Sequence, residues 1–249
     1  RGIIASGVQF YNSGSDELGM EYITIANTGN ATDFGNTIGA RTYRTGSCGN
    51  NVKGLIAGGY NYGTSSGWAT IDVNIIQTTG NATDFGDLTQ ARIGPSGVSS
   101  PTRGVWAGGS TPSAQNTIDY VTISTAANAV DFGDLDTSVG EAGPTGGSST
   151  TRGVFTGGNA PSRVNVIQYI TIASTGNATD FGDLTEVKGN TSDASNSIKH
   201  FVGGGQTPSL TDKIEKITIA TTGNATDMAD LTAGRSHGAA SSTSSGGLS

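Results

Sequence analysis

The chain of 249 residues offers few side chains for catalysis: two histidines, one cysteine and a repeated set of aspartates. His200 stands at the start of an expected strand, and His237 lies in a run of Gly, Ala and Ser. A hydrolytic site needs a nucleophile, a base and an orienting group together. The sequence places no Gly-x-Ser-x-Gly motif between a strand and a helix to provide them. We therefore expect no catalytic residue and no enzyme activity.

Metal chemistry is also not expected. Cys48 is the only cysteine, which excludes an intrachain disulfide and a cysteine-based zinc site. The repeated aspartates have two readings, because carboxylates in loops suit calcium but also hydrogen-bond to backbone amides in turns. Since they recur in every repeat, we favour the turn role and expect no metal or other cofactor. They are Asp33, Asp84, Asp131, Asp180 and Asp227, with Asp87, Asp134, Asp183 and Asp230 three positions later.

Composition limits the class of partner. The chain has 13 basic and 20 acidic residues, a net charge of -7, and no basic run that could follow a phosphate backbone. No apolar stretch approaches the roughly 18 residues of a membrane-spanning helix. We therefore expect neither a nucleic-acid partner nor membrane insertion. The apolar fraction of 33% would suit a disordered chain, but regular repeats argue against disorder.

An internal repeat organises the whole sequence. The segment GNATDFG occurs at residues 29–35, 80–86 and 176–182, and altered copies occur at residues 127–133 and 223–229. Successive copies start 47 to 51 residues apart, a period typical of propeller blades. The five repeats are residues 1–52, 53–102, 103–151, 152–198 and 199–249, which we interpret as one domain covering residues 1–249.

Each repeat contains the pattern of four strands. An alternating segment such as residues 118–123 (IDYVTI) predicts a strand, and Thr-Gly-Asn-Ala-Thr predicts a hairpin turn before the next one. A strand further upstream ends in paired glycines, as in residues 103–109 (RGVWAGG). A run of Gly, Ala and Ser makes up the fourth. Because only small side chains allow strands to crowd around an axis, we place this run innermost.

The two ends of the chain complement each other. The chain opens with the second strand of a blade and ends after a small-residue run near residues 238–245. That run would complete the blade begun by residues 1–39 and close the ring without an exposed edge. The sequence thus predicts an all-β fold, a five-bladed β-propeller of four-stranded antiparallel blades, with the C-terminal strand completing the N-terminal blade.

These units resemble kelch repeats, in which a strand ends in two glycines, a Tyr and a Trp follow, and an Arg begins the next inner strand. The glycine pairs are Gly58-Gly59, Gly108-Gly109, Gly157-Gly158 and Gly203-Gly204, weakened to Ser6-Gly7. Tyr matches at Tyr22, Tyr120 and Tyr169, whereas Val73 and Lys216 replace it. The Trp position holds Phe34, Phe85, Phe132, Phe181 and Met228. The basic position holds Arg41, Arg92, Lys188 and Arg235, with Val139 in the third repeat.

The sequence of residues 118–123 and of the GNATDFGDL segments also resembles that of kelch-like repeat proteins encoded by marine bacteriophages, including cyanophages. Such proteins are regarded as tail-fibre or other virion components. The resemblance covers nearly the whole chain and implies a location in the extracellular virus particle.

Four of the Asn-x-Ser/Thr sequons lie in the same turn of the repeat. We interpret their Asn as a turn residue rather than a glycan acceptor, and the resemblance to phage proteins supports this interpretation.

The loops that follow the glycine pairs are the expected binding surface, because they differ in length and content on a rigid scaffold. Exposed aromatic rings beside amides could stack on a sugar or anchor a protein partner. The same rings could equally cover blade edges, and the sequence leaves both readings open. The candidate ligand-binding residues are Phe10, Tyr11, Tyr60, Tyr62, Trp68, Gln115, Asn116, Arg163, Asn165, Gln206 and Asp212.

Together these observations favour a non-enzymatic virion module of a tail fibre or appendage. Its expected partners are other virion proteins or a host-surface glycan, with homo-oligomers on the particle as an option. Two alternatives remain open. One is a secreted, lectin-like propeller, and the other is a carbohydrate-active enzyme with its site at the central channel.

Overall fold

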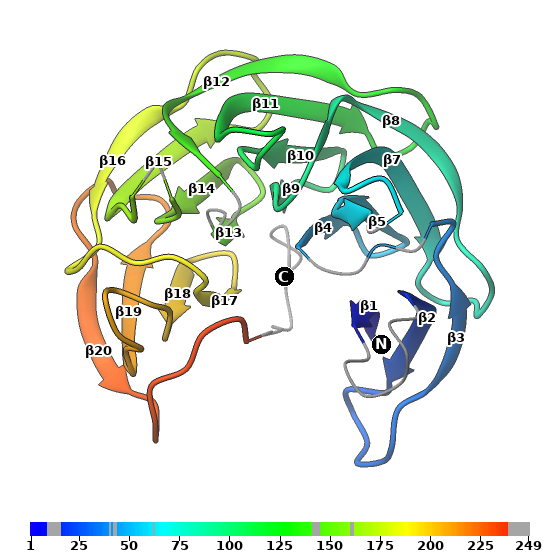
Figure 1. Cartoon of the computed structure of the whole chain (residues 1–249), viewed down its shortest axis with the longest axis horizontal. Coiled ribbons are helices and arrows are strands. Elements are labelled where there is room, and N and C mark those ends of the chain that lie inside the picture. The colour runs from blue at the N-terminus through cyan, green and yellow to red at the C-terminus, as the bar shows by residue number, and fades with distance from the viewer. Residues whose placement is uncertain are drawn as a thin grey trace.

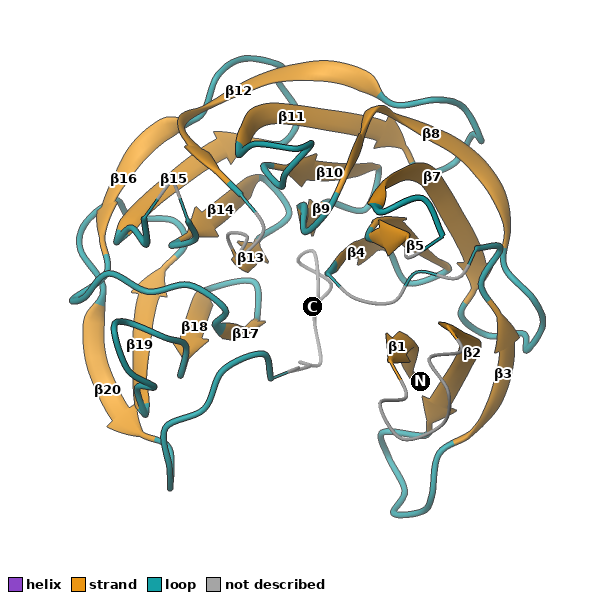
Figure 2. Cartoon of the chain, viewed as in Figure 1, coloured by secondary structure: helices purple, strands orange, loops and turns teal. Residues whose placement is uncertain are grey.

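The computed structural model of the chain confirms an all-β fold. It describes residues 1–8, 16–39, 41, 44–61, 63–140, 145–159 and 162–238, and within these ranges the regular structure consists of strands (Figure 2). No helix in these ranges could span a bilayer. Five small antiparallel sheets are arranged in a ring around a central axis (Figure 1). The chain is therefore a five-bladed β-propeller.

The strands follow one another from the axis outward within each blade. Blade 1 contains β1 (Gly2–Val8), β2 (Asp16–Ile23) and β3 (Thr32–Asn36). Blade 2 contains β4 (Thr45–Gly49), β5 (Lys53–Gly58), β6 (Tyr60–Asn61), β7 (Ser66–Ile75) and β8 (Thr83–Arg92). Blade 3 contains β9 (Ser96–Ser99), β10 (Arg103–Ala107), β11 (Gln115–Thr122) and β12 (Val130–Val139). Blade 4 contains β13 (Thr145–Ser148), β14 (Arg152–Thr156), β15 (Val166–Thr171) and β16 (Thr179–Asp183). Blade 5 contains β17 (Ser192–Ser195), β18 (Lys199–Gly203), β19 (Lys213–Thr218) and β20 (Thr226–Asp230).

Blade boundaries differ from the sequence repeats by one strand. The repeat 53–102 contains β5, β7 and β8 of blade 2 together with β9, the inner strand of blade 3. Each of the first four sequence repeats thus begins at the second strand of one blade and ends with the inner strand of the next. Each linker between blades therefore joins an outer strand to the inner strand of the next blade (Figure 1).

The innermost strands consist mainly of small residues, as predicted, with Val98 on β9 and Asp193 on β17 as exceptions. A Cβ added at Gly146 would lie 2.7 Å from the carbonyl oxygen of Gly97 on the neighbouring inner strand. A Cβ at Gly97 would collide with the backbone of Ser47 in the same way. Larger side chains at these two glycines are excluded by the close approach of the strands.

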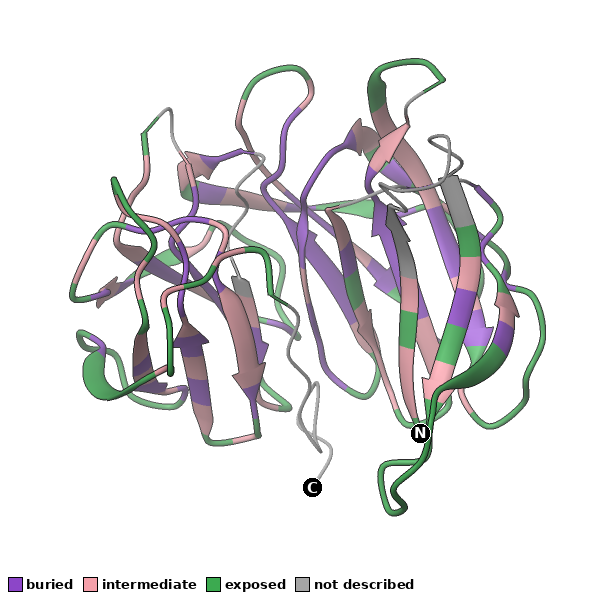
Figure 3. Ribbon diagram, turned by 60° about the horizontal axis from the view of Figure 1, so that its bottom comes forward, coloured by how far each residue is buried: buried purple, intermediate pink, exposed green. Residues whose placement is uncertain are grey.

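The hydrophobic core lies between adjacent blades. Phe132 on β12 packs with Val105 and Ile118 of its own blade and with Phe155 and Ile170 of blade 4. The Phe of the DFG segment also meets the repeat Tyr edge to face, with ring centroids 5.7 Å apart for Tyr120 and Phe132. Figure 3 shows the buried residues along the strands and the exposed residues at the turns. Burial of apolar side chains between neighbouring blades thus contributes to the stability of each blade.

Blade 1 has three strands among the described residues, and β1 corresponds to the second strand of the other blades. This confirms that the chain opens with a second strand. The segment predicted to supply the missing inner strand, residues 238–245, lies outside the described residues except for Gly238. In Figure 1 the ring is open between β20 and the hairpin of β2 and β3.

Candidate binding site on the loop face

One face of the ring carries both the loops after the glycine pairs and the linkers between blades. The pairs adopt positive φ angles, as in Gly157 (64°) and Gly158 (110°), which L-residues with a side chain rarely adopt. In blade 5 the residues with this geometry are Gly204 (62°) and Gly205 (104°). The assignment of Gly203-Gly204 from the sequence was therefore wrong by one residue, because three consecutive glycines made the pattern ambiguous.

The loops of blades 3, 4 and 5 have the same length, contrary to the expectation that every loop differs. In each, the residue after the glycine pair forms an isolated bridge with the residue four positions later: Ser110 with Ala114, Asn159 with Arg163, and Gln206 with Leu210. Blade 2 instead extends its loop as a hairpin, with β6 paired to β7. The loops of blades 3 to 5 therefore differ in side chains and not in length. Among the second partners of the three bridges, Ala114, Arg163 and Leu210, the charged residue is Arg163.

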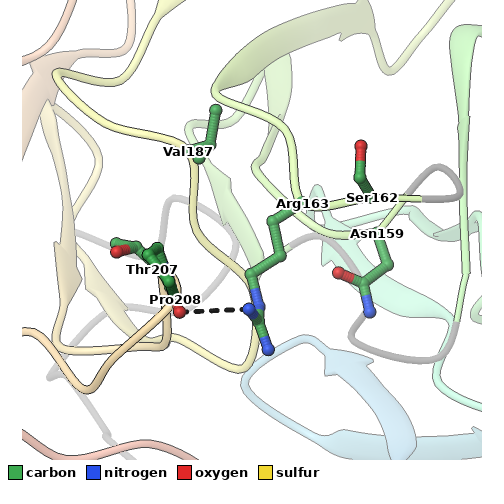
Figure 4. Close-up of a pocket in the computed structure, with 6 residues that line it drawn as sticks. All are labelled: Asn159, Ser162, Arg163, Val187, Thr207 and Pro208. Carbon is green, nitrogen blue, oxygen red and sulfur yellow. Dashed lines mark hydrogen bonds between the residues drawn. The ribbon is translucent and has the colours of Figure 1, made fainter.

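A pocket of about 490 Å³ lies where the loops of blades 4 and 5 meet (Figure 4). Blade 4 contributes Asn159, Ser162 and Arg163, its outgoing linker contributes Val187, and blade 5 contributes Thr207 and Pro208. The walls thus combine amide, hydroxyl and guanidinium groups with two apolar side chains. Such a lining can orient a polar ligand while covering its apolar face.

Arg163 connects the two blades that form this pocket. Its Nη1 donates to the carbonyl oxygen of Thr207 at 3.0 Å, and its Nε is buried without a hydrogen-bond partner (Figure 4). The guanidinium group is thereby fixed at the junction with unused donor capacity. Thr207 offers a second polar side chain beside it.

The other candidate residues that the structure describes do not line this pocket. Trp68 is half-buried, and its ring lies 5.7 Å from the Arg41 guanidinium and against Gly39, so it covers the junction of blades 1 and 2. Tyr60 lies on β6. For Trp68, the structure favours the edge-covering reading. Phe10, Tyr11 and Tyr62 lie outside the described residues.

The polar candidates have mainly local roles. Gln115 donates to the Ser113 carbonyl oxygen at 2.8 Å, and Asn116 and Asn165 are half-buried strand or loop residues. Gln206 pairs through its backbone with Gly189 of the incoming linker, and Asp212 is exposed. Of the predicted binding residues, Arg163 alone among those described lines the pocket; Asn159, Ser162 and Thr207 were missed.

The sequence analysis also missed buried ion pairs between blades. Arg41 pairs with Asp72, Arg92 with Asp119, and Lys188 with Glu215 at 2.5 Å, each pair joining the end of one blade to the third strand of the next. Burial lowers the pKa of Arg92 from its usual value, and the charge of Asp119 opposes this shift. The signal was available, since an acidic residue immediately precedes the repeat Tyr position in four of the five repeats, at Glu21, Asp72, Asp119 and Glu215.

The two histidines and the cysteine differ in burial and in local contacts. His200 is fully buried against Gly147, and burial lowers its pKa to about 4. His237 is exposed, with Nδ1 3.1 Å from Ser236 Oγ. Burial strongly raises the pKa of Cys48, which keeps the thiol protonated and unreactive. Asp193 on inner strand β17 was overlooked, and burial raises its pKa to about 7.

The repeated polar residues of the turns connect blades. The side-chain oxygen of Asn177 accepts a hydrogen bond of 3.1 Å from the Asp134 amide of the previous blade. Asn81, Asn128 and Asn224 do the same. Asp84 on β8 accepts a hydrogen bond from the amide of Gly86, a local backbone contact of the kind expected for this aspartate. The described part of the chain brings no three His, Cys, Asp or Glu side chains together as a metal site.

No protein-family model matches the chain, and no curated protein matches its sequence.

Proposed function

We propose that this propeller is a non-enzymatic binding and structural module of a virus particle, part of a tail fibre or another appendage. Its loop face binds a host-surface glycan or a second virion protein. Support for the viral context comes from the likeness of the repeats to marine bacteriophage proteins. Support for binding comes from the pocket between blades 4 and 5, which is the observation that carries the proposal.

The pocket suits a sugar better than an apolar ligand. Hydroxyl groups of a sugar can hydrogen-bond with Asn159, Ser162 and the guanidinium of Arg163. The carbon face of the same sugar can contact Val187 and Pro208. The net charge of -7 favours neither nucleic acid nor an anionic membrane as the partner. Several copies on one particle would raise the avidity of a weak site.

The test combines a glycan array with titration calorimetry on each sugar that binds. Arg163→Ala gives blade 4 the residue that blade 3 already carries at this position, Ala114, so the loop should keep its fold. We expect affinity to fall about tenfold, the effect of losing one charged hydrogen-bonding group. Asp212→Ala is the matched control, because Asp212 is exposed on the same face but does not line the pocket.

Cryo-microscopy of the intact particle tests the viral context separately. Density for the propeller on a fibre or appendage, with the loop face outward or against another virion protein, is the expected result. A propeller found free of the particle that still binds a sugar through Arg163 would identify a secreted lectin instead. Turnover of a bound sugar that depends on His237 would support the alternative of an enzyme at the central channel.

A further inference from the structure

Arg163 uses only part of its hydrogen-bonding capacity within the protein. Its Nη1 donates to the carbonyl oxygen of Thr207 at 3.0 Å, whereas its Nε is buried without a partner (Figure 4). Its Nη2 donates to no group of the residues that the structure describes. Nε–H and Nη2–H lie on the same edge of the planar guanidinium group. The protein therefore occupies one side of this group and leaves the other edge for an acceptor from a ligand.

The positive charge of Arg163 is not balanced by a carboxylate. Within the described part of the chain this side chain forms no ion pair, and the pocket lining contains no acidic residue. The nearby charges compensate one another instead. Lys188 Nζ lies 2.5 Å from Glu215 and 3.3 Å from Glu186. Lys213 Nζ lies 3.7 Å from the other oxygen of Glu186.

This local balance matters more for a bound ligand than the net charge of -7. At physiological ionic strength, exposed charges more than about 8 Å apart are largely screened from each other. An anion in the pocket is therefore attracted by the adjacent guanidinium group, although the chain as a whole is acidic.

The loop does not need a cation at this position in order to fold. The equivalent bridge residues are Ala114 in blade 3 and Leu210 in blade 5, and their loops have the same length and the same bridge. Ser138 stands at the junction of blades 3 and 4 where Val187 stands at the junction of blades 4 and 5. The cation and the apolar wall are thus features of this pocket and not of the repeat.

The rest of the lining suits a sugar that carries a carboxylate. Two coplanar oxygens of a carboxylate match one edge of a guanidinium group, so that two parallel hydrogen bonds form. Asn159 and Ser162 provide further polar groups, and Val187 and Pro208 provide an apolar wall (Figure 4). A uronic acid combines these features, because its ring has hydroxyl groups, an apolar carbon face and one carboxylate.

We propose that the pocket between blades 4 and 5 binds an acidic glycan, with the carboxylate of a uronic acid held by Arg163. This assignment rests on the proposed function and narrows its ligand class. The carboxylate accepts from Nη2, and a small rotation of the side chain toward the ligand brings Nε into the same contact. Asn159 and Ser162 bond the neighbouring hydroxyl groups. Binding then satisfies a buried donor that is unpaired in the free protein.

Matched sugars test the preference for a carboxylate. Galacturonic acid is compared with its methyl ester, which keeps the ring but lacks the charge, and with galactose; glucuronic acid and glucose form a second set. Titration followed by NMR measures each affinity in the unaltered protein. We expect each acid to bind about tenfold or more tightly than its ester, the effect of one hydrogen-bonded charge. Added salt should reduce this preference.

Variants at one position locate the effect. Arg163→Gln keeps hydrogen-bonding groups but removes the charge, and it should bind acid and ester within about twofold of each other. Arg163→Lys keeps the charge without the planar fork and should retain part of the preference. Asp212→Ala is the matched control and should retain all of it, because Asp212 is exposed and does not line the pocket. Unfolding curves of all variants check that the propeller is intact.

The possible results distinguish acid recognition from glycan binding as such. Equal affinity for acids and neutral sugars, lost in Arg163→Gln, would overturn the carboxylate assignment and leave the glycan site in place. A preference for acids that persists in Arg163→Gln would overturn the role of Arg163. Tighter binding of a sulfated galactose, or of an acidic peptide, would assign the site to that ligand instead. Absence of binding by every sugar would overturn both the acidic ligand and glycan binding.

Discussion

Arg92 at the end of blade 2 donates to the carboxylate of Asp119 in blade 3, and neither side chain is exposed to solvent. The next junction does without such a pair, because Val139 and Gln168 occupy the same positions. A buried ion pair is often no more stabilising than an uncharged replacement of similar volume. We therefore expect the intact pair to add little to the free energy of unfolding, although removal of one partner would leave a buried charge.

The first prediction follows from this natural replacement. Asp119→Ala leaves the Arg92 guanidinium buried without its counter-charge and should lower the free energy of unfolding by about 3–5 kcal/mol. The double variant Arg92→Val with Asp119→Gln reproduces the pair of the following junction and should recover most of the loss. Urea unfolding at neutral pH measures both. A double variant as unstable as Asp119→Ala would show that the charge itself is required.

A second prediction concerns the loss of stability at acidic pH. Burial lowers the pKa of His200 to about 4, below its usual value near 6.5, so the unfolded chain binds the proton more readily than the folded chain. The stability that the neutral ring contributes is present above pH 6.5 and is lost as the pH falls toward 4. Melting curves between pH 7 and pH 4.5 should therefore show a smaller drop in Tm for His200→Gln than for the parent. Parallel curves for the two proteins would contradict this role.

Asp193 gives a third prediction, with the opposite sign. Burial raises the pKa of Asp193 to about 7, so the folded chain binds a proton that the unfolded chain has released. The associated stability is present below pH 4 and is lost as the pH rises toward 7. Asp193→Ser introduces the residue of the corresponding inner-strand position in blade 2, Ser47. Its gain in Tm over the parent should grow between pH 5 and pH 8, and a gain independent of pH would argue against the carboxylate.

A fourth prediction uses the outer edge of the junctions. Gly86 has a φ of 142°, and a Cβ there would overlap the carbonyl of Ala127 in the next blade. Gly86→Ala should lower the free energy of unfolding by about 2 kcal/mol or more, as expected for a strained backbone with a steric clash. The reverse change at the same repeat position of blade 5, Ala229→Gly, should be neutral or stabilising. Equal destabilisation by both substitutions would show that the two positions are equivalent after all.

The turn asparagines provide the fifth prediction. Asn128 accepts a hydrogen bond from the Asp87 amide, so Asn128→Ala should cost about 1 kcal/mol of unfolding free energy. Asn30 is exposed at the same position of the turn between β2 and β3, the hairpin that borders the opening of the ring (Figure 1), and Asn30→Ala should have little effect. Chemical denaturation of the two variants compares them directly. A similar loss of unfolding free energy in both variants would indicate that Asn30 also accepts a hydrogen bond.

The sequence predicted the fold because its strongest signals are periodic. The repeat period, the alternating strands and the small inner residues act within one blade, and neighbouring repeats reinforce them. The sites were harder to predict because they depend on contacts between blades. Arg163 meets Thr207 across 44 residues of sequence, and no local pattern indicates that pair. Trp68 was similarly expected on a binding surface, whereas it covers the Arg41 junction.

The glycine pair of blade 5 shows a second limit of sequence patterns. Three consecutive glycines at residues 203–205 allow two registers, and only the backbone conformation distinguishes Gly204-Gly205 from the earlier pair. Equal loop lengths in blades 3 to 5 were also overlooked, because the differing side chains obscured the shared spacing of the bridges. In both cases the missing information was backbone geometry.

The basic residues that open the second strands of blades 1 to 4 reach toward the blade that follows, as Arg103 does toward blade 4, whereas Lys199 of blade 5 donates within its own blade. A nascent chain leaving the ribosome would therefore complete each interface only after the succeeding repeat had emerged. Its stability would accumulate stepwise from the amino terminus, and truncation after any repeat would leave the last cation without its acceptor. The propeller thus has a built-in order of assembly that its near-symmetric appearance conceals.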